Sequence, residues 1–372
     1  MASKAADSKK AGDKKADDKK TDRASESETR HGATMLPAVT LDSFNLELRT
    51  REGFLGDRAS KRAFWDIVEN ARKPLRKAKE DPFGDISTDD ITKKQLDEIL
   101  ADGDGEAAGL VIGAVEEFAG ELAGVIKKFL GEKGWERTER LAVGGGMRAG
   151  RVGELAIGRA GVLLKTDGVS VDLVPIRHDP DDAGLIGCAH LTPRWTLKGY
   201  DAILAIDIGG TNMRAGVVEL NASKKSNFAK ASVWRSKIWR HADDEPSRTA
   251  AVERLVKMLE DLIEHARDEK LALAPFIGIG CPGVIAPDGA IEKGGQNLPG
   301  GNWESEHFNL PKALRKAIPN IDGEDTHITM HNDAVVQGLS QTPFMDDVER
   351  WGVITIGTGL GNARFTNRGK DD

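Results

Sequence analysis

The sequence predicts an α/β protein with two domains, and three observations carry this prediction. The chain has 372 residues, and a domain usually takes about 150 residues. Short apolar runs of strand length alternate with segments whose apolar residues recur at helical spacing. Glycine-rich turns directly follow several of these apolar runs. Alternating strands and helices are typical of α/β domains with largely buried sheets.

The first 34 residues form a charged tail that we expect to be disordered. Residues 1–34 contain nine basic and seven acidic residues, and no large apolar residue follows Met1. A segment of this composition cannot bury a core. The simplest interpretation is a solubilising or variable extension.

The overall composition favours small molecules as partners. Lys and Arg number 53 against 60 Asp and Glu, a net charge of -7, and no predicted folded segment concentrates the basic residues. A specific nucleic-acid-binding role is therefore not expected. Two cysteines, Cys188 and Cys281, are too few for a disulfide framework or a Cys-based zinc site. No apolar run approaches the roughly 18 residues of a membrane span, and we expect a cytoplasmic protein.

The first half of the chain is predicted to be mostly helical before its glycine turn. Residues 61–71 read as a helix, and Ser87 and Asp90 resemble a capping box that starts a helix reaching residue 100. A long amphipathic helix follows at residues 110–129, and we expect it to lie at the domain junction. A short strand at residues 140–143 then enters a run of three glycines, Gly144, Gly145 and Gly146.

The second half repeats the alternation with more strands. The predicted strands are residues 202–206, 215–219, 276–279, 328–330 and 351–356. The predicted helices are residues 252–263 and 334–339. We expect these strands to form a buried sheet.

The first glycine turn of this half lies between two predicted strands, in the run Asp-Ile-Gly-Gly-Thr-Asn-Met-Arg. Its candidate phosphate-binding residues are Gly209, Gly210, Thr211 and Asn212. Glycine has no Cβ, so successive backbone N–H groups can approach a phosphate closely. Asp207, at the end of the strand, is a candidate Mg²⁺ ligand through water. The alternative is an ordinary tight hairpin with a capping Asp.

The second glycine turn follows the strand 351–356 and has the same chemistry. Gly357, Thr358 and Gly359 are its candidate phosphate-binding residues. Two such turns facing each other across a cleft would hold the phosphates of a nucleotide better than one.

A third motif, Asn332 and Asp333, stands where a predicted strand ends and a helix begins. Taken alone, it reads equally well as a helix N-cap. Between two phosphate-binding turns, however, Asp333 could accept the proton of an attacking hydroxyl, and it is our general-base candidate.

Together these motifs resemble those of a known family. The turns above, Asn332-Asp333-Ala334, and the runs Gly-Cys-Pro-Gly-Val (280–284) and Asn-Leu-Pro-Gly (297–300) resemble the first half of the ROK sugar kinases, members of the actin-like ATPase superfamily. The resemblance implies two actin-like ATPase (ribonuclease H-like) domains around a cleft. It also implies a glucokinase-like, ATP-dependent carbohydrate kinase that uses Mg²⁺. Asn297 and Asn332 would then orient the acceptor, and Gly144 to Gly146 would lie beside adenosine.

The order of the segments indicates a circular permutation of this family. Residues 35–200 resemble the second half of a ROK kinase, and residues 201–372 resemble the first half. Because chain ends usually lie at the surface and near each other, such a rearrangement is physically tolerable. It predicts that Arg368 lies next to residues 39–53.

The region of sugar recognition departs from the family's pattern. The run 53–60 reads Gly-Phe-Leu-Gly-Asp-Arg-Ala-Ser, so Asp57 stands where the family has Glu, and Ser60 stands where it has His. No Cys-rich loop follows, and zinc is not expected. Asp57 is a candidate sugar-binding residue, and a plain structural loop is an equally good interpretation of residues 53–60. These departures keep a second hypothesis open, a nucleotide- or sugar-binding sensor that has lost catalysis. Separately, a homodimer is a possible assembly.

Overall fold

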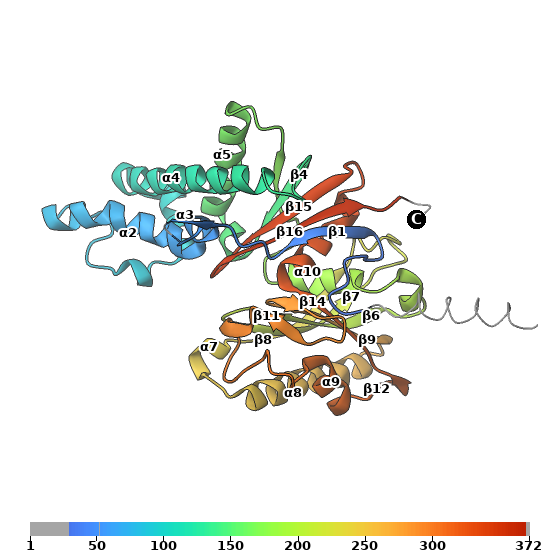
Figure 1. Ribbon diagram of the computed structural model, residues 1–372. Coiled ribbons are helices and arrows are strands. Elements are labelled where there is room, and N and C mark those ends of the chain that lie inside the picture. Colours follow the sequence, from blue (N-terminus) through green and yellow to red (C-terminus); the bar gives the residue numbers. More distant parts are fainter. Residues whose placement is uncertain (1–29, 52, 370–372) are drawn as a thin grey trace, which may run out of the picture.

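The computed structural model describes residues 30–51 and 53–369, which form two five-stranded sheets with helices on both sides of each (Figure 1). This arrangement confirms the predicted α/β class. Residues 1–29, most of the charged tail, lie outside the described residues.

Sheet I is built from one continuous part of the chain. Its strands are β6 (Ala202–Ile208), β7 (Met213–Glu219), β8 (Ser232–Trp239), β9 (Leu273–Cys281) and β14 (His327–Asn332). They lie in the order β8-β7-β6-β9-β14, in which β6, β7 and β8 are antiparallel while β9 and β14 run parallel to β6.

Sheet II has the same layout but takes its strands from both ends of the chain. Its strands are β1 (Val39–Phe44), β4 (Arg140–Gly144), β5 (Asp172–Pro175), β15 (Arg350–Ile356) and β16 (Leu360–Asn367). They lie in the order β1-β16-β15-β4-β5, in which β15, β16 and β1 are antiparallel and the other two run parallel to β15. A boundary near residue 200 divides the sequence into two segments. It does not divide the two sheets, because sheet II takes strands from both segments.

The pairing of β1 with β16 confirms the predicted neighbourhood of Arg368. Val39 pairs with Asn367, and the Arg368 N–H donates to the Ala38 carbonyl at 3.1 Å. The chain segments at either end thus complete one sheet.

Helices separate and cover the two sheets. They are α2 (Lys61–Ala78), α3 (Lys93–Asp102), α4 (Gly105–Leu130), α5 (Arg151–Thr166), α6 (Ala183–Gly187), α7 (His241–Asp244), α8 (Arg248–Asp268), α9 (Leu310–Ala317) and α10 (Asp333–Leu339). The remaining two-residue or three-residue strands are β2 (Arg49–Thr50), β3 (Gly53–Phe54), β10 (Val284–Ile285), β11 (Ile291–Lys293), β12 (Asn320–Ile321) and β13 (Glu324–Asp325). Among the described residues, no helix combines the length and apolar character needed to cross a membrane.

The central strands of both sheets, such as β6, β9 and β15, are buried on two faces, which produces three layers of core. In β6, Leu204 and Ile206 pack with α8, whereas Ile203 and Ala205 face the space between the sheets. Side chains alternate along a strand, so one apolar run serves both layers. The middle layer contains α6 and α10, and α10 contacts both sheets.

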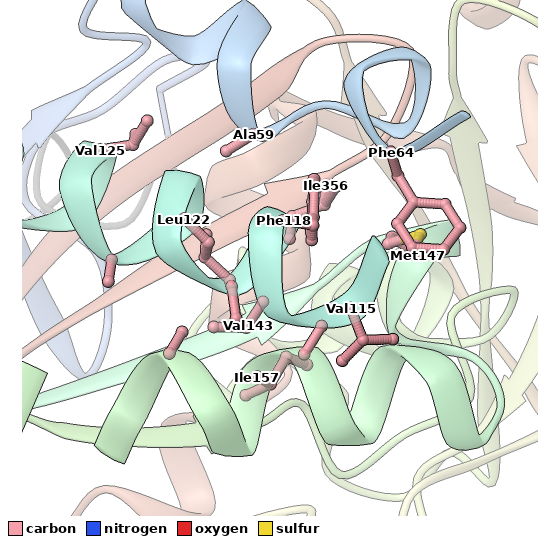
Figure 2. Packing of buried hydrophobic residues seen from close by; sticks show 14 of the residues in the cluster. Ala59, Phe64, Val115, Phe118, Leu122, Val125, Val143, Met147, Ile157 and Ile356 are labelled. Carbon is pink, nitrogen blue, oxygen red and sulfur yellow. The ribbon is translucent and has the colours of Figure 1, made fainter. Parts of the chain in front are cut away.

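The long helix α4 forms as predicted but does not lie at the domain junction. Its buried stripe, which includes Phe118 and Leu122, packs against α2, α3, α5 and the outer face of sheet II (Figure 2). Figure 1 places this helical group at the end of the molecule away from sheet I. The expectation was wrong because an apolar stripe shows that a helix packs, not against which surface it packs.

The predicted capping box at Ser87 and Asp90 is also displaced. These residues flank or belong to a short 3-10 turn, and α3 begins at Lys93 with Thr92 as its N-cap. The Thr92 side chain accepts from the Gln95 N–H, and the Gln95 side chain accepts from the Thr92 N–H. Two capping patterns stand five residues apart here, and the second one starts the helix.

The last residues of the predicted tail are part of the fold. The Gly32 N–H donates to the Met330 carbonyl at 3.0 Å, and the Met330 N–H donates to Nδ1 of His31 at 2.9 Å. The His331 ring donates from Nε2 to the Ala33 carbonyl at 3.1 Å. The tail boundary at residue 34 is therefore wrong, since residues 31–33 bind along the free edge of β14.

Truncating the centre of the α4 stripe should destabilise the protein. Phe118 is fully buried and meets the Phe64 ring edge-on at 5.6 Å. We expect Phe118→Ala to lower the free energy of unfolding by about 3–5 kcal/mol, measured by urea denaturation. Ile112→Ala on the exposed face of the same helix, where the side chain is 56% exposed, is the control and should change it by less than about 0.5 kcal/mol. An equally small change in Phe118→Ala would contradict this placement of α4.

A side chain at Gly32 should displace residues 31–33, which we call the arm, from the edge of β14. Gly32 has a φ of +59°, and a Cβ there would lie 1.9 Å from the Ile285 carbonyl oxygen. We expect Gly32→Ala to lower the melting temperature more than Gly84→Ala, because Gly84 has a φ of +60° but no atom within 4 Å of a Cβ. The left-handed backbone cost, about 1–2 kcal/mol, is common to both variants. Equal melting temperatures would show that the arm is not packed as described.

Candidate active site

A cleft of about 380 Å³ collects most of the predicted site residues. The glycine turn after β6 and the glycine turn after β15 both line it, as do Asp207 and Asp333. The two turns occupy equivalent positions, because each joins the first two strands of an antiparallel three-strand unit, one in each sheet. The shared strand order of the sheets therefore brings together two motifs that are 148 residues apart.

The glycine turns are closed by their own backbone bonds. The Gly209 N–H donates to the Asn212 carbonyl at 2.8 Å, and the Gly357 N–H donates to the Gly359 carbonyl at 2.9 Å. These two N–H groups shape the turns rather than serve a ligand. The cleft is lined by the turn residues that follow them, Gly210, Thr211, Thr358 and Gly359.

Asn332 positions Asp333 by capping α10. Its side-chain oxygen accepts from the backbone N–H groups of Ala334 and Val335, at 3.0 and 3.3 Å, and its amide donates to the Gly283 carbonyl at 2.9 Å. The side chain is only 2% exposed and is not among the cleft-lining residues. The sequence left a cap and a substrate contact open, and the geometry supports the cap.

Asp333 opens on the cleft from the first turn of α10. Burial of its carboxyl group, followed by the negative charge of Asp207, raises its pKa to about 7. Burial likewise raises the pKa of Asp207, which is 3% exposed. A carboxyl group with a pKa near neutrality suits a general base, because it is ionised often enough yet still basic.

An arginine compensates one of these two carboxylates. Arg214 approaches Asp207 with a 3.4 Å ion pair and forms a second ion pair with Asp181. Its Nε is buried and has no hydrogen-bond partner. The cleft floor therefore holds two poorly solvated carboxylates, and the arginine pairs directly with only the first.

The donors at the cleft floor fit a magnesium ion. Magnesium prefers oxygen ligands, usually one or two carboxylates together with phosphates and retained water. Asp207 supplies such oxygens, and a cation bound there would relieve its repulsion of Asp333. Among the described residues, no group of three or more His, Cys, Asp or Glu side chains could hold a metal.

Two further predicted residues, Gly144 and Asp57, do not line the cleft. Gly145 and Gly146 do, but Gly144 lies within β4 and does not. Asp57 is exposed in a 3-10 turn and its carbonyl accepts from the Ser60 hydroxyl at 2.9 Å. Asn297 lies in another 3-10 turn, beside the lining residue Gln296.

Residues outside the predicted motifs also line the cleft, among them Lys61, which the sequence placed on a solvated helix face with attraction of an anionic substrate as the alternative. Asn45 and Glu47 enter it from the segment after β1, and the Glu47 carboxylate meets Lys293 of β11 at 3.2 Å. This ion pair joins the two sides of the molecule. Lys61, Arg240 and Gln337 also line the cleft. Gln337 follows Asp333 by four residues, so both lie on one face of α10. No local sequence pattern identifies the other residues of this group as part of the cleft.

Comparison with known proteins agrees with the motifs. Residues 203–369, somewhat less than half of the chain, match the model of the ROK family. This stretch of the chain is therefore similar to the ROK family, as its motifs predicted. No curated protein matches the sequence.

Two solved structures are similar over part of the chain. A protein described as a sugar kinase from Cytophaga hutchinsonii is 22% identical, with a TM-score of 0.33, over 45% of this chain and 48% of that one. A protein described as an N-acetylmannosamine kinase from Listeria monocytogenes is 20% identical, with a TM-score of 0.30, over 45% of this chain and 47% of that one. The chain spans about half the length of these relatives.

Asp333 should make stability depend on pH. Its pKa is about 7 in the folded protein and about 4 when unfolded, so the native state holds the proton longer. Stability from this group therefore falls as pH rises from about 4 to about 7 and then levels off. We expect the stability of Asp333→Asn relative to the parent to rise across that range, measured by urea denaturation. Asp346→Asn, which removes an exposed carboxylate, is the control. Parallel curves for Asp333→Asn and the parent would contradict the raised pKa.

Proposed function

We propose that the protein transfers the terminal phosphoryl group of ATP to a hydroxyl group of a sugar or sugar-like molecule. One observation carries the proposal: two glycine turns, a carboxylate with a pKa near 7 and a second buried carboxylate line one cleft. The ROK-family match of residues 203–369 supports the same class of reaction. Phosphoryl transfer depends mainly on positioning and charge stabilisation, which such a cleft offers.

The proposal assigns a separate role in binding or proton transfer to each group of residues in the cleft. The turn residues Gly210, Thr211, Thr358 and Gly359 bind phosphate oxygens through backbone N–H and hydroxyl groups, and Gly145 and Gly146 face the nucleoside. Asp333 accepts the proton of the acceptor hydroxyl, and the Asn332 cap holds Asp333 in place. Asn297 and the neighbouring Gln296 contribute to the acceptor side.

Asp207 is the residue that would hold Mg²⁺, through water, and Asp333 stays free to act as the base. The ion supplies positive charge for the phosphate oxygens. The positive charge of Arg214 lowers the pKa of the Asp207 carboxyl group and so opposes part of the effect of burial.

We also propose that the chain is a circularly permuted form of the ROK architecture. The support is that both sheets share one strand order, while sheet II takes β15 and β16 from the end of the chain and β1, β4 and β5 from its beginning. The direct pairing of β16 with β1 supplies the continuity that a permutation requires.

A sensor that binds nucleotide or sugar without turnover is the second candidate. The direct ion pair between Arg214 and Asp207 favours it, because the arginine already provides the charge that a metal ion would bring. The pKa of Asp333 favours the kinase.

Asp333→Asn separates the two candidates. If the protein is a kinase, the variant should turn over at least about a hundredfold more slowly, the usual contribution of a general base. Its affinity for ATP should change little. Turnover of the parent, measured with a panel of hexoses, amino sugars and polyols, should also fall tenfold per pH unit below about pH 7.

Calorimetry of ATP binding to the same two proteins is the control. A parent that binds ATP but phosphorylates nothing in the panel would support the sensor. Equal turnover in parent and variant would remove Asp333 from the mechanism.

A further inference from the structure

Two lysines approach the glycine turns from helices that carry none of the family motifs. Lys61 is the first residue of α2; it lines the cleft, and its backbone N–H donates to the Gly357 carbonyl at 3.0 Å. Lys93 is the first residue of α3, and its ammonium group donates to the Gly146 carbonyl. Each lysine therefore contacts a different glycine turn of the same cleft; Lys61 lines the cleft itself, and Lys93 reaches it through Gly146.

Lys61 is distinguished from the other cations of the cleft by its lack of an ionic partner. Arg214 is paired with Asp207 and Asp181, and Arg240 meets Asp243 at 2.8 Å. Within residues 30–51 and 53–369, the Lys61 ammonium forms no ion pair. A cation at the edge of a cleft lined by phosphate-type turns is thus free to meet a ligand.

The two lysines lie close enough to affect each other. Burial lowers the pKa of Lys93, and the charge of Lys61 lowers it further, while Asp97, Asp179 and Asp181 act in the opposite direction. Two of these acids are engaged elsewhere: Asp97 accepts from the Val152 N–H at 2.9 Å, and Asp181 pairs with Arg214. An anion bound between the lysines would relieve their repulsion.

We propose that Lys61 and Lys93 bind the polyphosphate chain of the nucleotide, beside the backbone donors of the glycine turns. This inference rests on the proposed function, since it assumes that the cleft takes a nucleotide. It adds a contribution from residues 35–200 to phosphate binding, outside the segment 203–369 that matches the family. Lysine acts as a mobile point charge toward phosphate, whereas the backbone groups fix direction.

The test compares nucleotide binding to paired variants by calorimetry. We expect Lys61→Gln/Lys93→Gln to bind ATP at least about tenfold more weakly than the parent, because each change removes a charged contact to phosphate. Adenosine, which lacks phosphate, should bind to both proteins equally. The salt dependence of ATP affinity should also become less steep in the variant.

Two further variants make the result specific. Arg62→Gln/Lys94→Gln removes the same charge from the adjacent positions, whose side chains are 87% and 85% exposed and pair with Asp66 and Glu98; it should bind ATP like the parent. Lys61→Arg/Lys93→Arg keeps the charge and should bind ATP more tightly than the Gln pair, which also separates a charge effect from misfolding.

The possible failures are distinguishable. A parent that binds ATP with unchanged affinity after Lys61→Gln/Lys93→Gln would overturn this inference and leave the proposed function standing. Equal losses for ATP and adenosine, or equal losses in the control pair, would also overturn it. A parent that binds no ATP would overturn the proposed function, and the inference with it.

Discussion

The close packing of α10 between the two sheets is the constraint on which the rest of the structure depends. A Cβ on Gly187 of α6 would lie 1.8 Å from the Val336 carbonyl oxygen, and one on Gly338 would lie 2.8 Å from the Val353 and Phe365 side chains. Backbones therefore meet directly at this layer, with no room for side chains between them. Because α10 is held from both sides, its first residue, Asp333, is held at the floor of the cleft.

This placement has an electrostatic consequence. Asp333 and Asp207 end neighbouring parts of sheet I and share a poorly hydrated floor, so each raises the free energy of ionising the other. Arg214 compensates Asp207 directly, and the pKa of Asp333 stays near 7. The same packing that stabilises the interior therefore creates a carboxyl group that can exchange a proton near neutral pH.

The repeated strand order explains why the cleft has two similar walls. In each sheet a glycine turn follows the first strand of the antiparallel unit, and the two units face each other across α6 and α10. Helices α2 and α3, in contrast, belong only to the side of sheet II. The cleft is thus symmetrical in its backbone turns and asymmetrical in the side chains that surround them.

The sequence by itself determined the features that depend on neighbouring residues. The apolar runs at 202–206 and 351–356 became buried strands, and the glycine turns followed them, because strand periodicity and turn backbone are local properties. From the sequence alone, Asn332 could be either a helix cap or a contact to the ligand. Only the α10 hydrogen bonds decided for the cap.

The tertiary structure alone decided which distant segments meet. Lys61 and Glu47 line the cleft, whereas Asp57, which lies between them in the sequence, does not. Helix α4 packs away from the junction between the sheets, and residues 31–33 bind along β14. The physical reason is that an apolar stripe or a charged side chain is compatible with many surfaces. Its actual partner is selected by the simultaneous packing of all layers, to which residues hundreds of positions apart contribute.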